Sequence, residues 1–356
     1  MGKTEISRRR FLKMTGLTAA AAGAASVAFP HVITSTKGAA NELVFVGFGG
    51  GYQEGQTKAL FEPFEKETGI KVVQTTGVDL AKLRAQVQSK NVEWDLISIP
   101  DRLRFTAVQD GLLQKLNYGM INAKDIQKDL VTEYAVGCVT IPMLLTYSTK
   151  AHPPGKEPKT WMDYWDPAKV PGIRGMYNAP PYSLEFALIA DGVPKDKLYP
   201  LDVTRAFKSF DRIKPAVKVW WSQFPQPGVL LQSGEITMTP WTRSITPVFE
   251  GQPMGVSYDG AALTYEGWVV PTGAPNAQNA MKFINWALQP KPQAELTKYV
   301  AFGPTNKNAT QFVNPKLRPL LSSDPENVKK GFLLSGDWWG PNLEKVTEAW
   351  NEWRLK

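Results

Sequence analysis

The chain has 356 residues, a formal net charge of +8 and a pI near 9.3. Residues 1–40 hold six cations and one anion, so without them the formal charge falls from +8 to +3 and the rest is only mildly basic. This balance argues against nucleic acid as a partner, and the single cysteine, Cys138, excludes an intramolecular disulfide. The length after residue 40 suits two domains with cores of their own.

The N-terminus has the pattern of an export signal. The segment SRRRFLK at 7–13 resembles the twin-arginine signal at every position, and an alanine-rich apolar run follows over 14–29. We therefore expect residues 1–40 to be a signal peptide and the mature protein to act in the periplasm. Small residues allow cleavage after Ala28 or Ala40, and we favour Ala40 because the first strand follows at once. An uncleaved membrane anchor is the alternative, but a stable crossing needs roughly 20 strongly apolar residues.

Strands and helices alternate in the first part of the chain. Apolar runs at 43–46, 70–73 and 94–100 predict strands. Helical spacing of Leu60, Phe61 and Phe64, and then of Leu80, Leu83 and Val87, predicts the helices between them. Alternation of this kind predicts an α/β fold with a mostly parallel sheet flanked by helices.

Two apolar segments containing proline look like crossings between domains. The first runs from Cys138 to Ser148 and contains Pro142, which argues against a central strand. Between the crossings we expect helices near 183–191 and 204–213 and a strand over 235–241. The second crossing is the strand at 267–271, after which apolar stripes predict helices over 280–287 and 343–353.

The residues that most enzymes and metal sites need are scarce. Beyond residue 40 the chain has one histidine, His152, and one cysteine, so it cannot build a His/Cys zinc site. His152 lies in the turn-like segment AHPPG, which favours a surface loop over a catalytic role. The glycines at 47–51 do not match a dinucleotide or phosphate motif. We expect no catalytic residues, metal or cofactor.

The ordered set of segments resembles one family. It comprises VFVGFGGGYQEGQTKALFEPFEKETGIKVV, WDLISIPD, TYSTK, SGEITMTPW, GWVVPTGAPNAQNAMKFINWALQP and FGPTNKNA. The chain is similar to the bacterial extracellular solute-binding proteins of the polyamine-binding (spermidine/putrescine) type, which serve ABC importers. The resemblance implies a two-lobe periplasmic binding protein fold of type II, with the ligand in the cleft between the lobes. Lobe 1 would comprise 41–138 with 271–356, and lobe 2 would comprise 139–270.

The resemblance also implies where ligand contacts lie. Carried over position by position, they fall at the ends of the predicted strands, where the loops of an α/β sheet converge. They are Phe48, Tyr52, Asp101, Tyr182, Trp241 and Glu266. The family's polyamine binders have acidic residues near the position of Tyr182, whereas this chain has NAPPY at 178–182.

Arg243, two residues beyond Trp241, points to a different ligand. A guanidinium binds a carboxylate through two parallel hydrogen bonds, and Asp101 or Glu266 could take an ammonium group. We therefore expect a small zwitterion, such as an amino acid or an ω-amino acid of the γ-aminobutyrate kind. The alternative for Arg243 is a structural salt bridge with one of those two acids.

The twelve tryptophans divide into packing and candidate ligand residues. Trp350 and Trp353 lie on the apolar stripe of the last helix, and we also expect Trp94 and Trp286 to pack in the core. Trp241 is the best candidate for a ligand contact, since an aromatic face can hold an alkyl chain or an ammonium group. Trp221 and Trp339 are further candidates.

The sequence thus predicts a monomeric binding protein that delivers a small polar ligand to an ABC permease of the inner membrane and performs no chemistry. A polyamine-binding protein is the alternative within the same class. An exported hydrolase that uses paired carboxylates is the alternative from another class.

The first prediction concerns export. Replacing Arg8 and Arg9 by Lys keeps the charge but removes the forked donor geometry, so we expect the double variant to remain in the cytoplasm. The exported wild-type protein should begin near Asn41. Intact-mass measurement of the periplasmic fraction checks both, and unchanged export of the variant would contradict the twin-arginine assignment.

Overall fold

The computed structural model describes residues 41–242 and 252–356. Their strands form one ten-stranded mixed sheet. In sheet order the strands are β2 (Lys71–Thr76), β1 (Glu42–Gly47), β3 (Leu96–Pro100), β8 (Met254–Val269), β4 (Val136–Ser148), β7 (Met238–Trp241), β5 (Arg174–Tyr177) and β6 (Val217–Trp221), while β9 (Gly303–Pro304) pairs with β4 and β10 (Phe332–Leu333) with β8. Each end of the sheet therefore consists of three parallel strands, and the two longest strands lie antiparallel in the middle.

Helices surround both ends of this sheet. The α-helices are α2 (Gly50–Gln56), α3 (Glu62–Thr68), α4 (Leu80–Gln88), α5 (Asp101–Gln109), α6 (Trp161–Trp165), α7 (Pro180–Ala190), α8 (Val203–Ile213), α9 (Gln226–Ser233), α11 (Ala277–Ala287), α12 (Pro290–Leu296), α13 (Pro325–Lys330) and α14 (Gly336–Leu355). A π-helical turn, Thr57–Phe61, joins α2 to α3, and 3₁₀ turns occur at Lys128–Leu130, Lys195–Lys197, Lys214–Ala216, Ala309–Phe312 and Arg318–Leu320. Among the helices within the described ranges, none has the length and apolarity that a membrane crossing requires.

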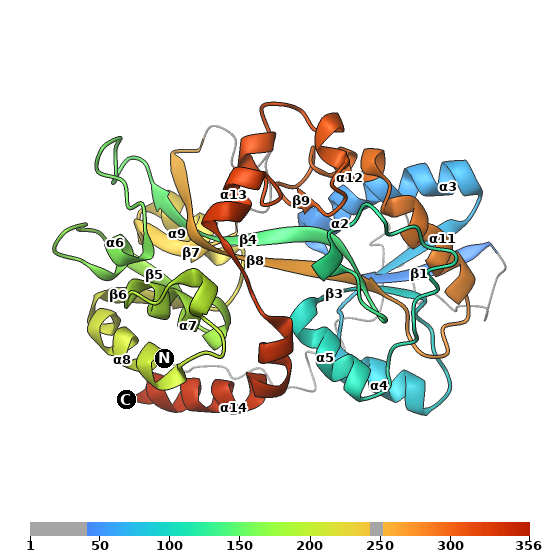
Figure 1. The fold of residues 1–356 in the computed structure, drawn as a ribbon, viewed down its shortest axis with the longest axis horizontal. Coiled ribbons are helices and arrows are strands. Elements are labelled where there is room, and N and C mark those ends of the chain that lie inside the picture. The colour runs from blue at the N-terminus through green and yellow to red at the C-terminus, as the bar shows by residue number, and fades with distance from the viewer. Residues whose placement is uncertain (1–40, 243–251) are drawn as a thin grey trace, which may run out of the picture. The chain divides into compact units, whose positions relative to one another are not determined.

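The two ends of the sheet are the two lobes of the predicted fold. We call β1, β2 and β3 with their helices lobe 1, and β5, β6 and β7 with α6 to α9 lobe 2. Figure 1 shows β4 and β8 side by side between these two groups. The expected α/β class with mostly parallel strands in each lobe is confirmed.

The strands of lobe 1 are apolar on both faces because helices cover both. Leu43 and Phe45 of β1 pack into a cluster with residues of α3 and α11. Val44 and Val46, which alternate with them, pack on the other face with Leu83 of α4 and Ala107 of α5.

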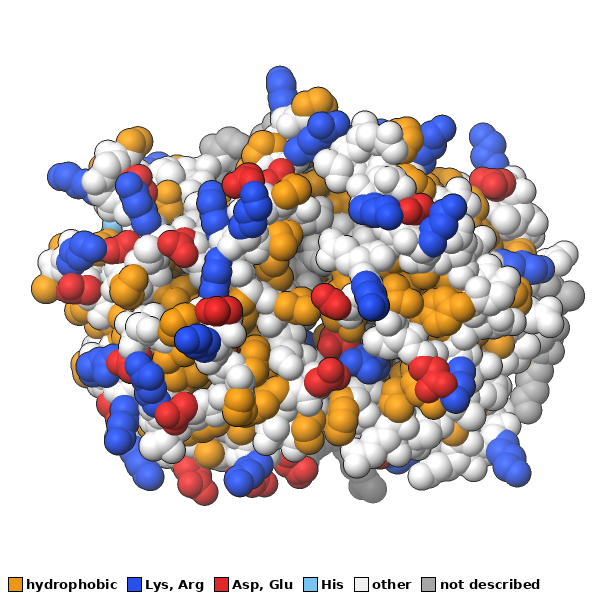
Figure 2. All heavy atoms as spheres, in the orientation of Figure 1, with side chains coloured by type: hydrophobic (Ala, Val, Ile, Leu, Met, Phe, Trp, Pro, Cys, Tyr) orange, Lys and Arg blue, Asp and Glu red, His pale blue; other side chains and the backbone are white. Residues whose placement is uncertain are grey.

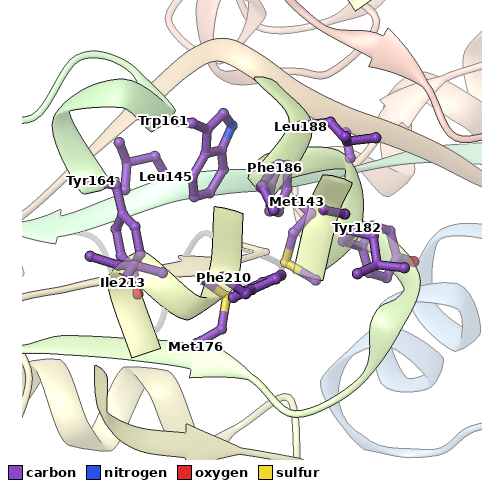
Figure 3. Packing of buried hydrophobic residues seen from close by; sticks show 14 of the residues in the cluster. Met143, Leu145, Trp161, Tyr164, Met176, Tyr182, Phe186, Leu188, Phe210 and Ile213 are labelled. Carbon is purple, nitrogen blue, oxygen red and sulfur yellow. The ribbon is translucent and has the colours of Figure 1, made fainter. Parts of the chain in front are cut away.

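Lobe 2 has a core of its own, rich in aromatic rings. Trp161 stacks on Phe186 with ring centroids 3.7 Å apart. Figure 3 shows these rings packed with Met143 and Leu145 of β4, which contributes to this cluster as well as to the first. One strand therefore supplies core residues to both lobes.

Helix α14 also joins the two lobes. Its buried Trp339, Trp350 and Trp353 pack in the lobe 2 core, while its first turn lies against α5 of lobe 1. The lobe boundaries given above stay a prediction, and from this packing we propose that residues 336–355 go with lobe 2 rather than lobe 1.

The expectation that Pro142 excludes a central strand is wrong. Pro142 lies inside β4, opposite Leu263 of β8. On its other edge, β4 pairs with β9 at Val139 and Thr140 and with β7 from Leu144 onward. The proline thus stands between two partners, where no ladder bond needs its missing N–H.

The contact between α14 and α5 leads to a prediction about stability. A Cβ on Gly336 would lie 1.8 Å from Oδ2 of Asp101, and that carboxylate is held by Tyr265 and Arg104. Helix propensity favours Ala over Gly, but overpacking typically costs about 1–3 kcal/mol. We therefore expect Gly336→Ala to lower the free energy of unfolding.

Denaturant unfolding of the ligand-free protein measures this change. Glu344→Ala, at an exposed position of the same helix, is the control and should change stability little. A Gly336→Ala variant as stable as the wild type would show that α14 and α5 are not packed this closely.

Candidate functional site

A cavity of about 280 Å³ lies where the two lobes and the crossing strands meet. Its lining comes from the ends of strands β1, β3, β6 and β7, from the start of α7, from both long strands, and from Phe302. The lining residues are Phe48, Gly49, Tyr52, Pro100, Arg102, Ile141, Pro142, Met143, Tyr182, Phe224, Thr242, Thr264, Tyr265, Glu266 and Phe302. Parallel strands point their carboxyl ends at such a cleft, which is where α/β folds bind ligands.

Three larger hollows lie elsewhere and have no such arrangement. One, of about 640 Å³, is lined almost entirely by residues 118–124. Another, of about 620 Å³, is lined by the loop residues around 151–159 and 163–171 of lobe 2 alone. The third, of about 470 Å³, is lined by Lys159, Lys195, residues 256–259, Asn327, Lys329 and Lys330. None of the three has lining residues from the strand ends of both lobes, so the 280 Å³ cavity is the candidate site.

Glu266 provides a buried carboxylate in this cavity. It lies on β8 and is 7% exposed, and its Oε2 accepts a hydrogen bond of 2.6 Å from the Ser98 hydroxyl. Burial raises its pKa, while the Ser98 hydrogen bond, the charge of Arg102 and the Tyr52 hydroxyl lower it. The predicted role of Glu266 as a partner for an ammonium group is compatible with this position.

Arg102 provides a positive charge in the same cavity. It follows Asp101 in the first turn of α5, is partly buried, and makes no ion pair within 4 Å to any described carboxylate. Burial raises the pKa values of Tyr177 and Tyr182 in lobe 2, and the charge of Arg102 lowers both. Arg102 therefore reaches from lobe 1 toward lobe 2.

Aromatic rings form much of the remaining wall. Tyr52 packs edge to face on Phe302 at 5.1 Å between ring centroids, and Phe48 and Phe224 are 49% and 40% exposed. Tyr182 has a φ of 70°, which a bulky L-residue rarely adopts. In Figure 3 its phenol oxygen points away from the other labelled core residues. Strain at a site residue of this kind is typical of a functional position.

Several predicted site residues lie beside the cavity rather than in its lining. The buried Trp241 donates through Nε1 to the Phe224 carbonyl, at 2.7 Å. Trp221 donates to the Thr239 hydroxyl at 2.8 Å, and Trp339 donates to Glu185 at 2.6 Å. All three indoles thus have hydrogen-bonded N–H groups and lie outside the cavity lining, and Trp241 holds the backbone of the lining residue Phe224.

Asp101 is also turned away from the cavity lining. Its Oδ1 accepts hydrogen bonds from Arg104 at 2.6 Å and from Tyr265 at 2.5 Å. Arg104 continues to Asp337 of α14 at 3.3 Å. In the structure Asp101 therefore links α5, β8 and α14, a role that the sequence did not indicate.

Arg243, the predicted partner of a ligand carboxylate, lies outside the described residues. Of the nine predicted site residues, Phe48, Tyr52, Tyr182 and Glu266 line the cavity. Their part in binding a ligand stays a prediction.

The sequence interpretation missed Arg102, Ser98, Thr242, Phe224 and Phe302. The signal for Arg102 was present, because it follows the same strand end as Asp101. Thr242 lies next to the predicted Trp241, and its buried hydroxyl has no hydrogen-bond partner among the described residues. The other three carry no pattern that separates them from packing residues.

Metal ligands do not gather in the described part of the chain, where no group of three or more His, Cys, Asp or Glu could hold an ion.

The expectation that His152 lies in a surface loop needs correction. Its side chain is buried, 4% exposed, and lies 3.2 Å from the Thr237 hydroxyl. Figure 2 shows basic and acidic side chains interspersed over one face of the molecule, without a continuous basic patch.

Residues 59–328 match the family described as bacterial extracellular solute-binding proteins. The chain belongs to this family. Solute-binding proteins of this kind bind small molecules and deliver them to ABC permeases, and this is the class that the sequence predicted.

The relatives differ in their similarity to this chain. A γ-aminobutyric acid-binding protein of Pseudomonas aeruginosa is 29% identical over 325 residues, covering 88% of this chain and 91% of the relative. A solved γ-aminobutyrate receptor is 32% identical, with a TM-score of 0.81 and coverage of 88% and 98%. A binding protein of Agrobacterium tumefaciens solved with agropinic acid is 38% identical, with a TM-score of 0.76 and coverage of 88% and 99%. The spermidine/putrescine-binding periplasmic protein of Escherichia coli is more distant, at 23% identity over 76% of this chain and 81% of the relative.

The bond between Trp339 and Glu185 generates a prediction about pH. Glu185 is fully buried in lobe 2, and burial raises its pKa from 4.5 to about 7. Because the folded state holds the proton more tightly than the unfolded chain, its stabilising contribution is complete below about pH 4.5 and is lost as the pH rises through about 7. Glu185→Gln should remove this dependence, so the variant gains stability relative to the wild type from pH 5 to pH 8.

Denaturant unfolding over that pH range measures the difference. Glu344→Gln, the same substitution at an exposed position of α14, is the control. Parallel profiles for Glu185→Gln and wild type would show that Glu185 titrates normally in the folded protein.

Proposed function

We propose that this protein binds a small zwitterion of the γ-aminobutyrate kind in the cavity between its lobes and carries it through the periplasm to an ABC permease. We infer that it performs no chemistry on the ligand. The observation that carries the proposal is the pairing of Glu266 and Arg102 in the lining of one small cavity.

The two charges suit the two ends of such a ligand. A carboxylate in an apolar cavity binds an ammonium group, and a guanidinium binds a carboxylate. Glu266 and Arg102 are not in contact with each other within 4 Å, so each can take a ligand group. We assign the amine to Glu266 and the carboxylate to Arg102.

The walls suit the part of the ligand between its charges. Tyr52, Phe48 and Phe224 offer ring faces for a short alkyl chain and, near Glu266, for the ammonium group. The volume of about 280 Å³ is at the lower end of ligand cavities. The ligands named for the γ-aminobutyrate relatives support the same class.

The alternatives fit the described lining less well. A polyamine carries at least two ammonium groups, whereas Glu266 is the single carboxylate among the described lining residues and Arg102 would repel a cation. A glycoside hydrolase needs two carboxyl groups flanking the substrate, and Asp101 is held by Arg104 and Tyr265. The agropinic acid of one relative is a larger anionic ligand that belongs in the test panel.

Arg243 stays a predicted second partner for the ligand carboxylate. Its alternative role was a salt bridge with Asp101 or Glu266. Asp101 has Arg104 as a partner and Glu266 accepts a hydrogen bond from Ser98, so each acid has a partner among the described residues. We therefore expect Arg243→Ala to weaken binding without destabilising the ligand-free protein.

Titration calorimetry with γ-aminobutyrate, putrescine, spermidine and agropinic acid tests the proposal. Leaving a buried charge without its partner costs roughly 3–5 kcal/mol, so Glu266→Gln should weaken γ-aminobutyrate binding by about two to four orders of magnitude. A hydrogen bond to a charged group is worth about 1.5–3 kcal/mol, so Arg102→Ala should weaken it about 10- to 100-fold.

Matched controls separate binding from folding. Glu185→Gln changes a buried glutamate outside the cavity, and Arg84→Ala changes an arginine paired with Asp110 at the surface. Both should bind normally. Binding of putrescine but not γ-aminobutyrate by the wild type would overturn the proposal in favour of a polyamine.

A further inference from the structure

Ser98 is a polar residue at a fully buried position of β3. Its strand neighbours Ile97 and Ile99 are buried and apolar, and Ser98 itself has no exposed surface. A buried hydroxyl without a partner typically costs about 1–3 kcal/mol. The hydroxyl of Ser98 avoids this cost by donating to Oε2 of Glu266 at 2.6 Å.

Cys138 supports the same glutamate from β4. Its Sγ donates to the backbone carbonyl of Glu266 at 3.2 Å and lies 3.9 Å from the Ser98 hydroxyl. Neither side chain lines the cavity. Ser98 and Cys138 therefore form a layer behind Glu266, and only Ser98 contacts the carboxylate itself.

We propose that Ser98 is a positioning residue that keeps Glu266 ionised and directs its second oxygen, Oε1, toward the amine of the ligand. This inference rests on the proposed function, because it assigns the ligand's amine to Glu266. Ser98 then determines the pH below which the protein loses its ligand.

The groups around Glu266 define what Ser98 contributes. Burial favours the neutral carboxyl group and raises the pKa of Glu266. Three groups favour the ionised form, namely the Ser98 hydroxyl from β3, the Arg102 charge from α5 and the Tyr52 hydroxyl from α2. Tyr52 and Cys138 face it as neutral groups, since burial raises the pKa of each. Loss of Ser98 removes the 2.6 Å hydrogen bond to Oε2 of the Glu266 carboxylate.

The experiment compares ligand affinity across pH in the wild type and in Ser98→Ala, with γ-aminobutyrate as the probe. Without the hydroxyl, the pKa of Glu266 rises further, so affinity should fall at a higher pH than in the wild type. Near neutral pH the variant should bind about 10- to 100-fold more weakly. Raising the pH should restore most of this loss, which a general packing defect would not allow.

Three further variants make the result specific. Ser322→Ala removes another buried hydroxyl, which bonds to Thr140, and should leave the pH profile unchanged. Ser98→Thr keeps the hydroxyl and should restore the wild-type profile. Ser98→Cys keeps a side chain of similar shape with a weaker hydrogen-bond donor and should give an intermediate pH profile. This variant also tests the inference if Ser98→Ala fails to fold.

An NMR titration of the Glu266 carboxyl carbon in the ligand-free protein separates this inference from the proposed function. Glu266→Gln assigns the signal. A higher Glu266 pKa in Ser98→Ala supports the positioning role even if γ-aminobutyrate proves not to be the ligand. An equal pKa in both proteins overturns it even if γ-aminobutyrate binds.

Discussion

The antiparallel pair of β4 and β8 is the constraint on which the rest of the structure depends. These strands pair from Val136 and Trp268 at one end to Ser148 and Met254 at the other, so they run through both lobes. Their length fixes the distance between the two sets of parallel strands, whose carboxyl ends then meet over the middle of the pair. The cavity lies there because β4 changes its second partner from β9 to β7 at Pro142. Glu266 lies three residues along β8 from Leu263, the partner of Pro142, and both Pro142 and Glu266 line the cavity, so the fold places a carboxylate between the two lobes.

The two buried acids of this region have opposite roles, and their partners decide which is which. Asp101 is held by a guanidinium and a phenol and lies under the first turn of α14, so its charge is neutralised within the protein. Glu266 accepts a hydrogen bond from the Ser98 hydroxyl, the Tyr52 hydroxyl also favours its ionised form, and the guanidinium of Arg102 lies further off. Its charge is less well compensated in a site of low polarity, where a ligand cation would interact strongly with it. Among the described residues Asp101 has an ion-pair partner and Glu266 has none, so Glu266 is the acid better suited to a ligand.

The sequence predicted the fold and part of the site because strand ends can be recognised from apolar runs and breakers. Phe48 and Tyr52 follow one such strand and Glu266 directly precedes another, and all three line the cavity. The direction in which a side chain points from a helical turn cannot be recognised in the same way. The sequence analysis therefore chose Asp101 over Arg102, although the two are adjacent. The tryptophans are ambiguous for another reason: an indole suits a ligand wall and a core equally well, and the structure adds only that Trp221 bonds to Thr239 and Trp339 to Glu185. The role of Ser98 could not be predicted from the sequence because its partner Glu266 is 168 residues away in the chain.

Charge placement explains how a family with polyamine-binding relatives can accommodate a zwitterion. A second ammonium group would need a second acid, and the described lining offers Arg102 in the region where the cavity approaches Tyr182. In the proposed assignment, Arg102 favours a carboxylate at one end of the ligand, where a polyamine has an ammonium group. Glu266 still favours an ammonium group at the other end. The energetic difference is large, because like charges brought together in a partly buried site repel by about as much as opposite charges attract. Under the proposed assignment, selectivity between the two ligand classes follows from one cation, Arg102, on a scaffold of crossing strands.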